Sequence, residues 1–281
     1  MEIYFKNNEI YYTDQEVEGE SGQYYDLDER LGAGGNGVVY KCISQDGTEY
    51  AVKILMHKTN KSTQRFAQEV ELMRKVSNDH VIRYVDKGEI HLRTAGKGFN
   101  APFVIMELAE QNLLDYIKEN SQLTYEAYVP QFRGLCEGLK EIHKYAVHRD
   151  IKPENILIKG EKWILSDFGL CDFLAQDEKQ DITRPNEKVG PIYWISPEAV
   201  NYAVFNKDEI GTWSDVYQLG LVFAFVLLRR YPGGVFSESE TLNTTMPIKK
   251  VVFDSISNNY IRRPKNGAAL LEAFNSATIN A

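Results

Sequence analysis

The stretch VHRDIKPEN, residues 147–155, is followed a short way along the chain by SDFG, residues 166–169. Together the two stretches bring one ammonium group, one amide and a pair of carboxylates to fixed, short spacings. These side chains belong to Asp150, Lys152, Asn155 and Asp167. A match of this length is hardly expected by chance, so we treat the side chains as one constellation that decides both the fold and the chemistry.

The constellation supplies the groups that are needed to transfer a phosphoryl group from a metal-bound nucleotide to a hydroxyl. Asp150 would orient the acceptor hydroxyl and take its proton late in the reaction, and Lys152 would neutralise charge on the moving phosphate. The amide oxygen of Asn155 and the carboxylate of Asp167 would hold Mg²⁺ or Mn²⁺. We therefore expect catalysis that relies mainly on positioning and on neutralisation of charge.

A glycine-rich segment, GAGGNGVV at residues 32–39, precedes this constellation in the chain. Its glycines Gly32, Gly34 and Gly37 allow backbone amides to approach phosphates with no Cβ in the way. The pattern alone is weak, because plain hairpin turns and dinucleotide-binding folds use similar glycines. In dinucleotide-binding folds the loop leads into a helix, whereas residues 38–43 predict a strand. The sequence therefore favours a strand-loop-strand lid over phosphates.

Lys53 stands in an apolar stretch, residues 49–55, that predicts a strand. A lysine in such a strand costs free energy unless an anion pairs with it. The expected partners are the α- and β-phosphates of a nucleotide and Glu69, which lies on a helix predicted by apolar residues at helical spacing between residues 66 and 76. Glu71, on another face of that helix, is the rival partner. An ordinary solvated surface pair is the remaining alternative.

Strands and helices are expected in different halves of the chain. From about residue 24 to 108 the pattern is mostly that of strands with one helix, and helices dominate afterwards. Residues 1–23 are polar, acidic and rich in tyrosine, and we expect them to form a loose or edge-strand extension. The helices predicted after residue 108 cover residues 112–120, 124–145, 213–230 and 266–276. Pro130 indicates that the helix over residues 124–145 starts later or bends there.

The bulk composition argues against several classes of function. The 281 residues carry a formal charge of -8, which disfavours binding to nucleic acid or to an anionic membrane surface. The longest apolar run, residues 219–228, is much shorter than the roughly 20 residues that a membrane-spanning helix needs. The start of the chain lacks the pattern of a signal peptide. Because Cys42, Cys136 and Cys171 form no C-x-x-C pair, we expect neither a zinc site nor disulfides, and a reducing, cytoplasmic location.

Taken together, the motifs resemble those of a eukaryotic-type (Hanks-type) protein kinase, and the resemblance covers nearly the whole chain. It implies the α+β, bilobal protein kinase fold. The small β-rich N-lobe with one main helix would cover about residues 24–108, and the larger helical C-lobe about residues 109–281. Residues 24–281 would then be the catalytic domain, with a ligand cleft between the lobes.

The same resemblance implies a reaction. ATP would be the phosphoryl donor, Mg²⁺ or Mn²⁺ the cofactor, and a protein with a serine or threonine acceptor the substrate. Lys152, placed two positions after Asp150, is the pattern of serine/threonine kinases. We also expect autophosphorylation. The sequence gives no indication of the oligomeric state.

The resemblance assigns roles to single residues around the nucleotide. Lys53 and Glu69 would form the ion pair that marks an active state, and Met106 would be the gatekeeper. The carbonyl of Glu107 and the N–H of Ala109 would bond the adenine edge. Apolar contacts to the nucleotide would come from Leu31, Val39, Ala51 and Leu157. For these apolar residues simple core packing is the alternative.

Further residues would have structural roles. Glu198, in Ser196-Pro197-Glu198, would pair with Arg263, and Asp215 would brace the backbone of the catalytic loop. The stretch between Asp215 and Arg263 is short for the family, so we expect fewer or shorter helices there.

One segment departs from the family pattern. Gly190-Pro191 stands where the family has Gly-Thr, and proline has neither a hydroxyl nor an N–H. Substrate alignment would then differ, or Thr183 or Ser196 would contribute, or phosphorylation of peptides would be weak. Thr183 is also the candidate phosphosite, because a phosphate there would pair with Arg149 and order the segment. Acidic residues beside Thr183 are the alternative source of that charge.

Three functions therefore compete. The first is an active serine/threonine protein kinase. The second is a nucleotide-binding, pseudokinase-like scaffold, which Pro191 alone favours. The third is a small-molecule kinase, which the Ser196-Pro197-Glu198 segment and the position of Lys152 argue against.

Overall fold

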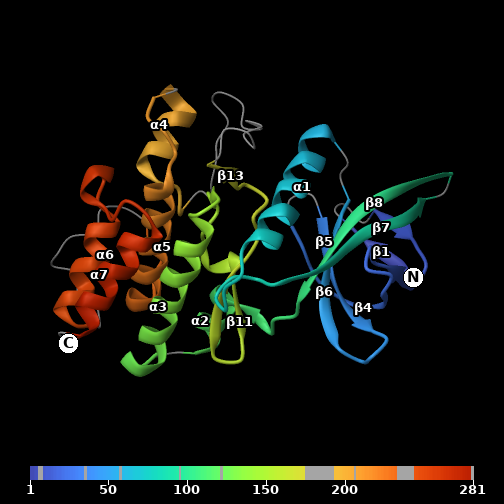
Figure 1. Ribbon diagram of the computed structural model, residues 1–281, viewed down its shortest axis with the longest axis horizontal. Helices are drawn as coiled ribbons and strands as arrows, with labels where there is room; N and C mark the ends of the chain where they lie inside the picture. Colours follow the sequence, from blue (N-terminus) through green and yellow to red (C-terminus); the bar gives the residue numbers. More distant parts are fainter. Residues whose placement is uncertain are drawn as a thin grey trace. The chain divides into compact units, whose positions relative to one another are not determined.

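The protein is described from a computed structural model (Figure 1). The structure describes residues 1–5, 9–34, 37–56, 59–94, 96–120, 123–174, 193–205, 207–232 and 244–279. These residues form two compact units. The first unit comprises Met1–Arg74 and Ile82–Ala109, and the second comprises Lys75–Val81 and Glu110–Ala281. Strands dominate the first unit and helices the second, which confirms the predicted α+β class.

The first unit is built on an antiparallel sheet of eight strands in the order β1-β2-β7-β8-β6-β5-β4-β3. Its strands are β1 (Glu2–Tyr4), β2 (Ile10–Tyr12), β3 (Glu16–Glu18), β4 (Tyr24–Ala33), β5 (Gly37–Ser44), β6 (Glu49–Leu55), β7 (Tyr84–Thr94) and β8 (Lys97–Glu107). The helix α1 (Asn60–Lys75) follows β6 in the chain. The predicted series of strands interrupted by one helix is therefore confirmed.

The sheet curves until its β3 edge comes back to β7. The backbone N–H of Glu20, just after β3, donates to the carbonyl of Lys87 on β7 at 2.7 Å, although β4, β5, β6 and β8 separate the two strands in the sheet. Close approach there depends on Gly88, where a Cβ would lie 2.6 Å from the ring of Phe103 and 2.8 Å from the carbonyl of Glu18. A substitution at Gly88 would force these strands apart.

The residues before β4 are part of this sheet. Strands β1 and β2 form one edge, and β3 pairs with β4 at the other. Ile3, Phe5 and Val17 are buried in the same apolar cluster as Tyr40 and Phe103. Burial of each such side chain contributes roughly 1.5–3 kcal/mol. Residues 1–23 therefore contribute to the core of the first unit, and their described part forms strands at both edges of the sheet.

The two faces of the sheet carry different sets of side chains. Because side chains alternate along a strand, Tyr40 on β5, Val52 on β6 and Ile105 on β8 point into the buried cluster. The alternate residues of the same strands, among them Ala51 and Lys53, lie on the opposite face. The strand register thus separates a core face from a face that is available for function.

The second unit contains α2 to α7 and several short strands. The helices are α2 (Leu113–Glu119), α3 (Tyr125–Ile142), α4 (Pro197–Phe205), α5 (Thr212–Leu228), α6 (Met246–Ser255) and α7 (Gly267–Ile279), with 3-10 turns η2 (Pro153–Asn155) and η4 (Tyr260–Arg262). The strands are β9 (Gln111–Asn112), β10 (Ala146–Val147), β11 (Ile156–Lys159), β12 (Lys162–Leu165) and β13 (Asp172–Phe173). All the helices predicted after residue 108 are present within a few residues of their expected ends.

Of the two alternatives expected at Pro130, a later start or a bend, the structure excludes the later start. Helix α3 begins at Tyr125 and includes Pro130, so it does not start later than predicted. The proline lies close to the helix start and interrupts a single backbone hydrogen bond, a loss that the buried apolar face of α3 offsets. The stretch between α5 and Arg263 carries α6 and η4 in its described part.

Aromatic packing holds α3, α5 and α7 together. Phe132 of α3 stacks on Phe223 of α5 with ring centroids 3.9 Å apart, and Phe274 of α7 contacts both rings. Helix α5 is buried along most of its length, as its run of apolar residues predicted. Figure 1 shows α5 among α3, α6 and α7. This helix is the rigid element on which the catalytic loop of the second unit rests.

Candidate active site

Lys53 and Glu69 form an ion pair within the first unit. The Nζ atom of Lys53, on β6, lies 2.6 Å from Oε1 of Glu69 on α1. The Glu69 side chain is 5% exposed and that of Lys53 is 21% exposed, whereas Glu71 lies on the exposed face of the helix. Of the two predicted partners the structure therefore selects Glu69. Removing one member of such a pair leaves a largely buried charge uncompensated, which is strongly destabilising.

Three of the residues expected around an adenine ring, Val39, Ala51 and Met106, share the sheet face of Lys53. Directly opposite residues point to the same side of a sheet, and the register pairs Val39 with Lys53 and Ala51 with Met106. Ala51 is buried, and Val39 and Met106 are partly buried. The face that carries the lysine is thus lined by small and apolar side chains.

Beyond Met106 the chain leaves the sheet through the segment expected to bond adenine. Glu107 is the last residue of β8, and its backbone N–H donates to the carbonyl of Arg83 at 3.1 Å. Its side chain accepts from the N–H of Arg83 at 2.9 Å. Ala109 ends the first unit. Leu157 belongs to the second unit, on β11, and is half-buried there.

The glycine-rich segment joins β4 to β5 as a hairpin, so the predicted strand-loop-strand arrangement is confirmed. Gly32 pairs with Val39, and the N–H of Gly34 donates to the carbonyl of Gly37 at 2.9 Å. A Cβ on Gly37 would lie 2.5 Å from the carbonyl oxygen of Ile54, so no larger residue fits there. Leu31, at 45% exposure, lies on β4 beside the turn.

The catalytic loop of the second unit brings the predicted polar groups together. Lys152 Nζ lies 3.0 Å from Oδ2 of Asp150, and the Nδ2 atom of Asn155 donates to the same Oδ2 and to the carbonyl of Asp150, each at 2.8 Å. Asp150 is only 8% exposed. Burial raises the pKa of Asp150 above its ordinary value, the ammonium of Lys152 opposes this, and the carboxylate of Asp167 adds to it.

Asn155 and Asp167 fit a divalent cation. Because Asn155 uses its nitrogen on Asp150, its oxygen is the atom left to face a ligand. Asp167 lies near enough to Asp150 to raise its pKa. Among the described residues there is no cluster of three or more His, Cys, Asp and Glu side chains that could hold a metal. An amide oxygen and one carboxylate suit Mg²⁺, which takes its other ligands from water and substrate phosphates.

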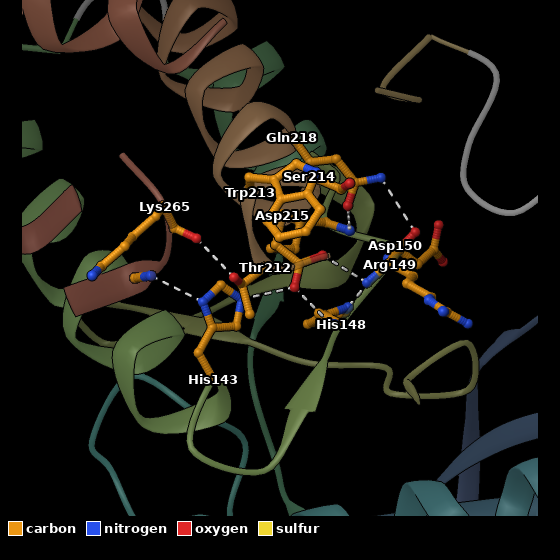
Figure 2. Close-up of polar contacts among 12 residues, drawn as sticks. His143, His148, Arg149, Asp150, Thr212, Trp213, Ser214, Asp215, Gln218 and Lys265 are labelled. Carbon is orange, nitrogen blue, oxygen red and sulfur yellow. Dashed lines mark hydrogen bonds and ion pairs between the residues drawn. The ribbon is translucent and has the colours of Figure 1, made fainter. Parts of the chain in front are cut away.

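Two side chains of α5, Asp215 and Gln218, bond the catalytic loop, as Figure 2 shows. Asp215 accepts the backbone N–H groups of His148 at 2.7 Å and Arg149 at 2.8 Å, as predicted. His143 donates to Asp215 at 2.9 Å. Burial acts to raise the pKa of Asp215, but the hydrogen bond and charge of His143 and the Arg149 N–H outweigh it, so the pKa is lowered. Asp215 is therefore held as a carboxylate.

Three contributors were missed from the sequence. Gln218 bonds the loop backbone on both sides of Asp150, His143 supports Asp215, and Asp172 accepts a hydrogen bond from the guanidinium of Arg149. None of them belongs to a motif that was recognised. The signal available for Gln218 was its place three residues after Asp215, on the same face of an expected helix.

The predicted pair of Glu198 and Arg263 is present and doubly bonded. Arg263 donates to the two carboxylate oxygens of Glu198 at 2.7 and 3.0 Å, and both side chains are buried. Ser214 of α5 also donates to Glu198. The start of α4 is thereby fixed to α5 and to the turn before α7.

The expectations about the segment before α4 concern residues 175–192. Thr183, Gly190 and Pro191 lie outside the described residues, as do the acidic residues beside Thr183. Ser196 is described and is 1% exposed. Its burial leaves it poorly placed to meet a substrate.

Comparison with known proteins agrees with the resemblance to protein kinases that the motifs indicate. Residues 25–273 match the family described as protein kinase domain. The chain is 28% identical over 225 residues to the receptor-like serine/threonine-protein kinase SD1-7 of Arabidopsis thaliana, covering 77% of this chain and 25% of that protein. It is 32% identical over 212 residues to the serine/threonine-protein kinase pkn2 of Myxococcus xanthus, covering 72% of this chain and 24% of that protein. The chain thus spans about a quarter of the length of these relatives.

Within the described part of the chain, no helix has the length and apolar character needed to cross a membrane.

Proposed function

This chain belongs to the protein kinase domain family, and from that premise we propose that it transfers the γ-phosphoryl group of ATP to serine or threonine hydroxyls of proteins. The observation that carries the proposal is the cluster of Asp150, Lys152 and Asn155 around one carboxylate oxygen. The printed names of the relatives support the serine/threonine acceptor. We also propose autophosphorylation, since the chain itself carries such hydroxyls.

Asp150 is the residue that would meet the acceptor hydroxyl. Lys152 and Asn155 both bond its Oδ2 atom, which fixes the orientation of the carboxylate. The carboxylate would accept a hydrogen bond from the hydroxyl, align its oxygen for in-line attack, and take the proton late in a loose transition state. Lys152 would neutralise charge on the transferred group.

The nucleotide phosphates and the metal ion would each be held by a separate group of residues. Lys53, fixed by Glu69, would bind the α- and β-phosphates, and the backbone of the turn between β4 and β5 would cover them. Asn155 and Asp167 would hold Mg²⁺ or Mn²⁺. When bound, the metal ion would supply positive charge that neutralises the phosphates.

The remaining expectations are part of the same proposal. Residues 24–281 would be the catalytic domain, with residues 1–23 as an extension built into the sheet of the first unit. The net charge of -8 argues against nucleic acid as a partner. We also propose a reducing, cytoplasmic setting, because the spacing of the three cysteines in the sequence suggests neither a zinc site nor disulfides.

The test is intact-protein mass spectrometry after incubation with Mg-ATP and a generic basic protein as acceptor. Wild type should add phosphate units to itself or to the acceptor, and Asp150→Asn should add none while still binding ATP. Peptide mapping would show whether serine or threonine is modified. ATP binding without transfer by wild type would overturn the proposal and favour the pseudokinase-like scaffold.

A further inference from the structure

Gln218 contacts the backbone on both sides of the proposed catalytic aspartate. Its Oε1 atom accepts the N–H of Ile151 at 3.0 Å, and its Nε2 atom donates to the carbonyl of Arg149 at 3.2 Å. Asp150 lies between these two residues in the chain. Gln218 is 3% exposed, so water has little access to compete for these bonds.

The chemistry of the side chain suits this position. A primary amide presents donor and acceptor on a single planar group. Here the donor faces a carbonyl and the acceptor faces an N–H, and the flipped amide would place like groups against each other at both contacts. The hydrogen bonds therefore fix the orientation of the amide and, through it, the spacing between Arg149 and Ile151.

The loop backbone needs such support because it is strained. Arg149 has a φ of 70°, in the left-handed region that non-glycine residues rarely adopt. Such conformations persist only where the surrounding structure holds them. Asp215 bonds the N–H of Arg149 and Gln218 bonds its carbonyl, so α5 holds both polar backbone groups of the strained residue (Figure 2).

Asp215 and Gln218 hold different parts of the loop backbone. Asp215 holds the N–H groups of His148 and Arg149, which lie before the catalytic aspartate. Gln218 holds the N–H of Ile151, which follows the catalytic aspartate in the chain. Without Gln218, the bonds from α5 described above would hold the backbone before Asp150, and the bond from Asn155 to the Asp150 carbonyl would remain after it.

We infer that Gln218 is a positioning residue for phosphoryl transfer: by bonding the carbonyl of Arg149 and the N–H of Ile151, it sets the direction of the Asp150 carboxylate. The inference rests on the proposed function. Gln218 touches neither nucleotide nor acceptor, so its loss should change the rate of the chemical step and leave nucleotide binding intact.

The test compares Gln218→Met with Gln131→Met. Methionine keeps the length of the side chain and removes both hydrogen bonds. Gln131, on α3, accepts the backbone N–H of Trp163 at 3.1 Å, away from the catalytic loop, and so is a matched glutamine. Gln218→Ser is a second variant that leaves room for water to satisfy the backbone groups, so that a folded protein can be studied if the methionine variant unfolds.

The readouts separate positioning from stability. With Mg-ATP and a basic protein acceptor, Gln218→Met should lose roughly ten- to a hundredfold in kcat, with the KM for ATP unchanged within about twofold. Amide hydrogen exchange over residues 147–152 should accelerate. Gln218→Ser should change in the same direction, whereas Gln131→Met should lower Tm and leave kcat unchanged.

Each contrary result has its own meaning. An unchanged kcat in folded Gln218 variants, or an equal loss of kcat in Gln131→Met, would overturn the inference. Unchanged hydrogen exchange would show that Gln218 does not hold the loop, and would overturn it as well. If wild type itself shows no transfer that depends on Asp150, the proposed function fails instead, and the exchange measurement still decides whether Gln218 fixes the loop.

Discussion

The guanidinium of Arg149 donates a hydrogen bond to the carboxylate of Asp172, and the residues beside them are joined by the pairing of β10 with β13. Val147 is the register partner of Asp172. Arg149, the residue before the proposed catalytic aspartate, is thus linked to the chain just after Asp167 by a charged hydrogen bond, and the neighbouring strands are linked by backbone pairing. Asp172 supplies a negative charge at Arg149, a charge that the sequence pattern led us to expect from a phosphate on Thr183 or from its acidic neighbours.

We therefore expect Asp172→Asn to lower kcat for transfer by roughly tenfold, the effect of losing one charged hydrogen bond. Thr183→Ala should keep most of the wild-type rate, because Asp172 already provides a carboxylate to Arg149. Steady-state kinetics with Mg-ATP and a basic acceptor would measure both. Asp79→Asn, which removes an exposed ion pair with Lys162, is the control and should have no effect. A larger loss in Thr183→Ala than in Asp172→Asn would contradict this account.

The pair of Lys53 and Glu69 gives a second expectation. Glu69→Gln keeps the shape of the side chain but removes the charge that holds Lys53, so kcat/KM should fall by about tenfold or more. Glu71→Gln, two residues away on the exposed face of α1, should leave kcat/KM unchanged. Initial rates at low ATP concentration would compare the two variants. Equal losses would mean that the ion pair does not organise the phosphate site.

The acid limb of the pH–rate profile should report Asp150. Its pKa is raised by burial and by Asp167, and the charge of Lys152 lowers it. Only the carboxylate form can accept a proton, so kcat/KM should fall as the pH drops through a value above the ordinary pKa of about 3.9 for Asp. Lys152→Met removes the opposing charge and should move this limb to higher pH in addition to lowering the rate. A limb that stays in place, or moves to lower pH, would contradict the role of burial at Asp150.

A structural feature could be predicted from the sequence when the residues that form it lie close together in the chain. Asp150, Lys152 and Asn155 lie within one short stretch, so a linear pattern is enough to group them. Helix α5 was predicted from its apolar run for the same reason. Gln218 and Asp172 act through contacts with residues far away in the chain, and no local pattern marks such a side chain as functional.

The short strands at the start of the chain show the same limit. Strands β1, β2 and β3 have three residues each, too few for period-two alternation to identify a strand. They are stabilised by pairing with β7 and β4 and by burial in the cluster that includes Tyr40, both of which are long-range effects. The helix α3 illustrates the converse, since tertiary packing overrides the local effect of Pro130.

Burial of the first strand leads to a final prediction, about stability. Ile3 is 0% exposed in the cluster that the curved sheet encloses, whereas the neighbouring Tyr4 is 44% exposed. Ile3→Ala should reduce the free energy of unfolding by about 2–5 kcal/mol, because it removes buried methyl groups and leaves a cavity. Tyr4→Ala, on the same strand, should cost less than about 1 kcal/mol. Urea denaturation followed by tryptophan fluorescence and by circular dichroism would measure both. If the residues before β4 were a dispensable extension, the two variants would unfold at the same urea concentration as wild type, and truncation of the first strands would leave transfer activity unchanged.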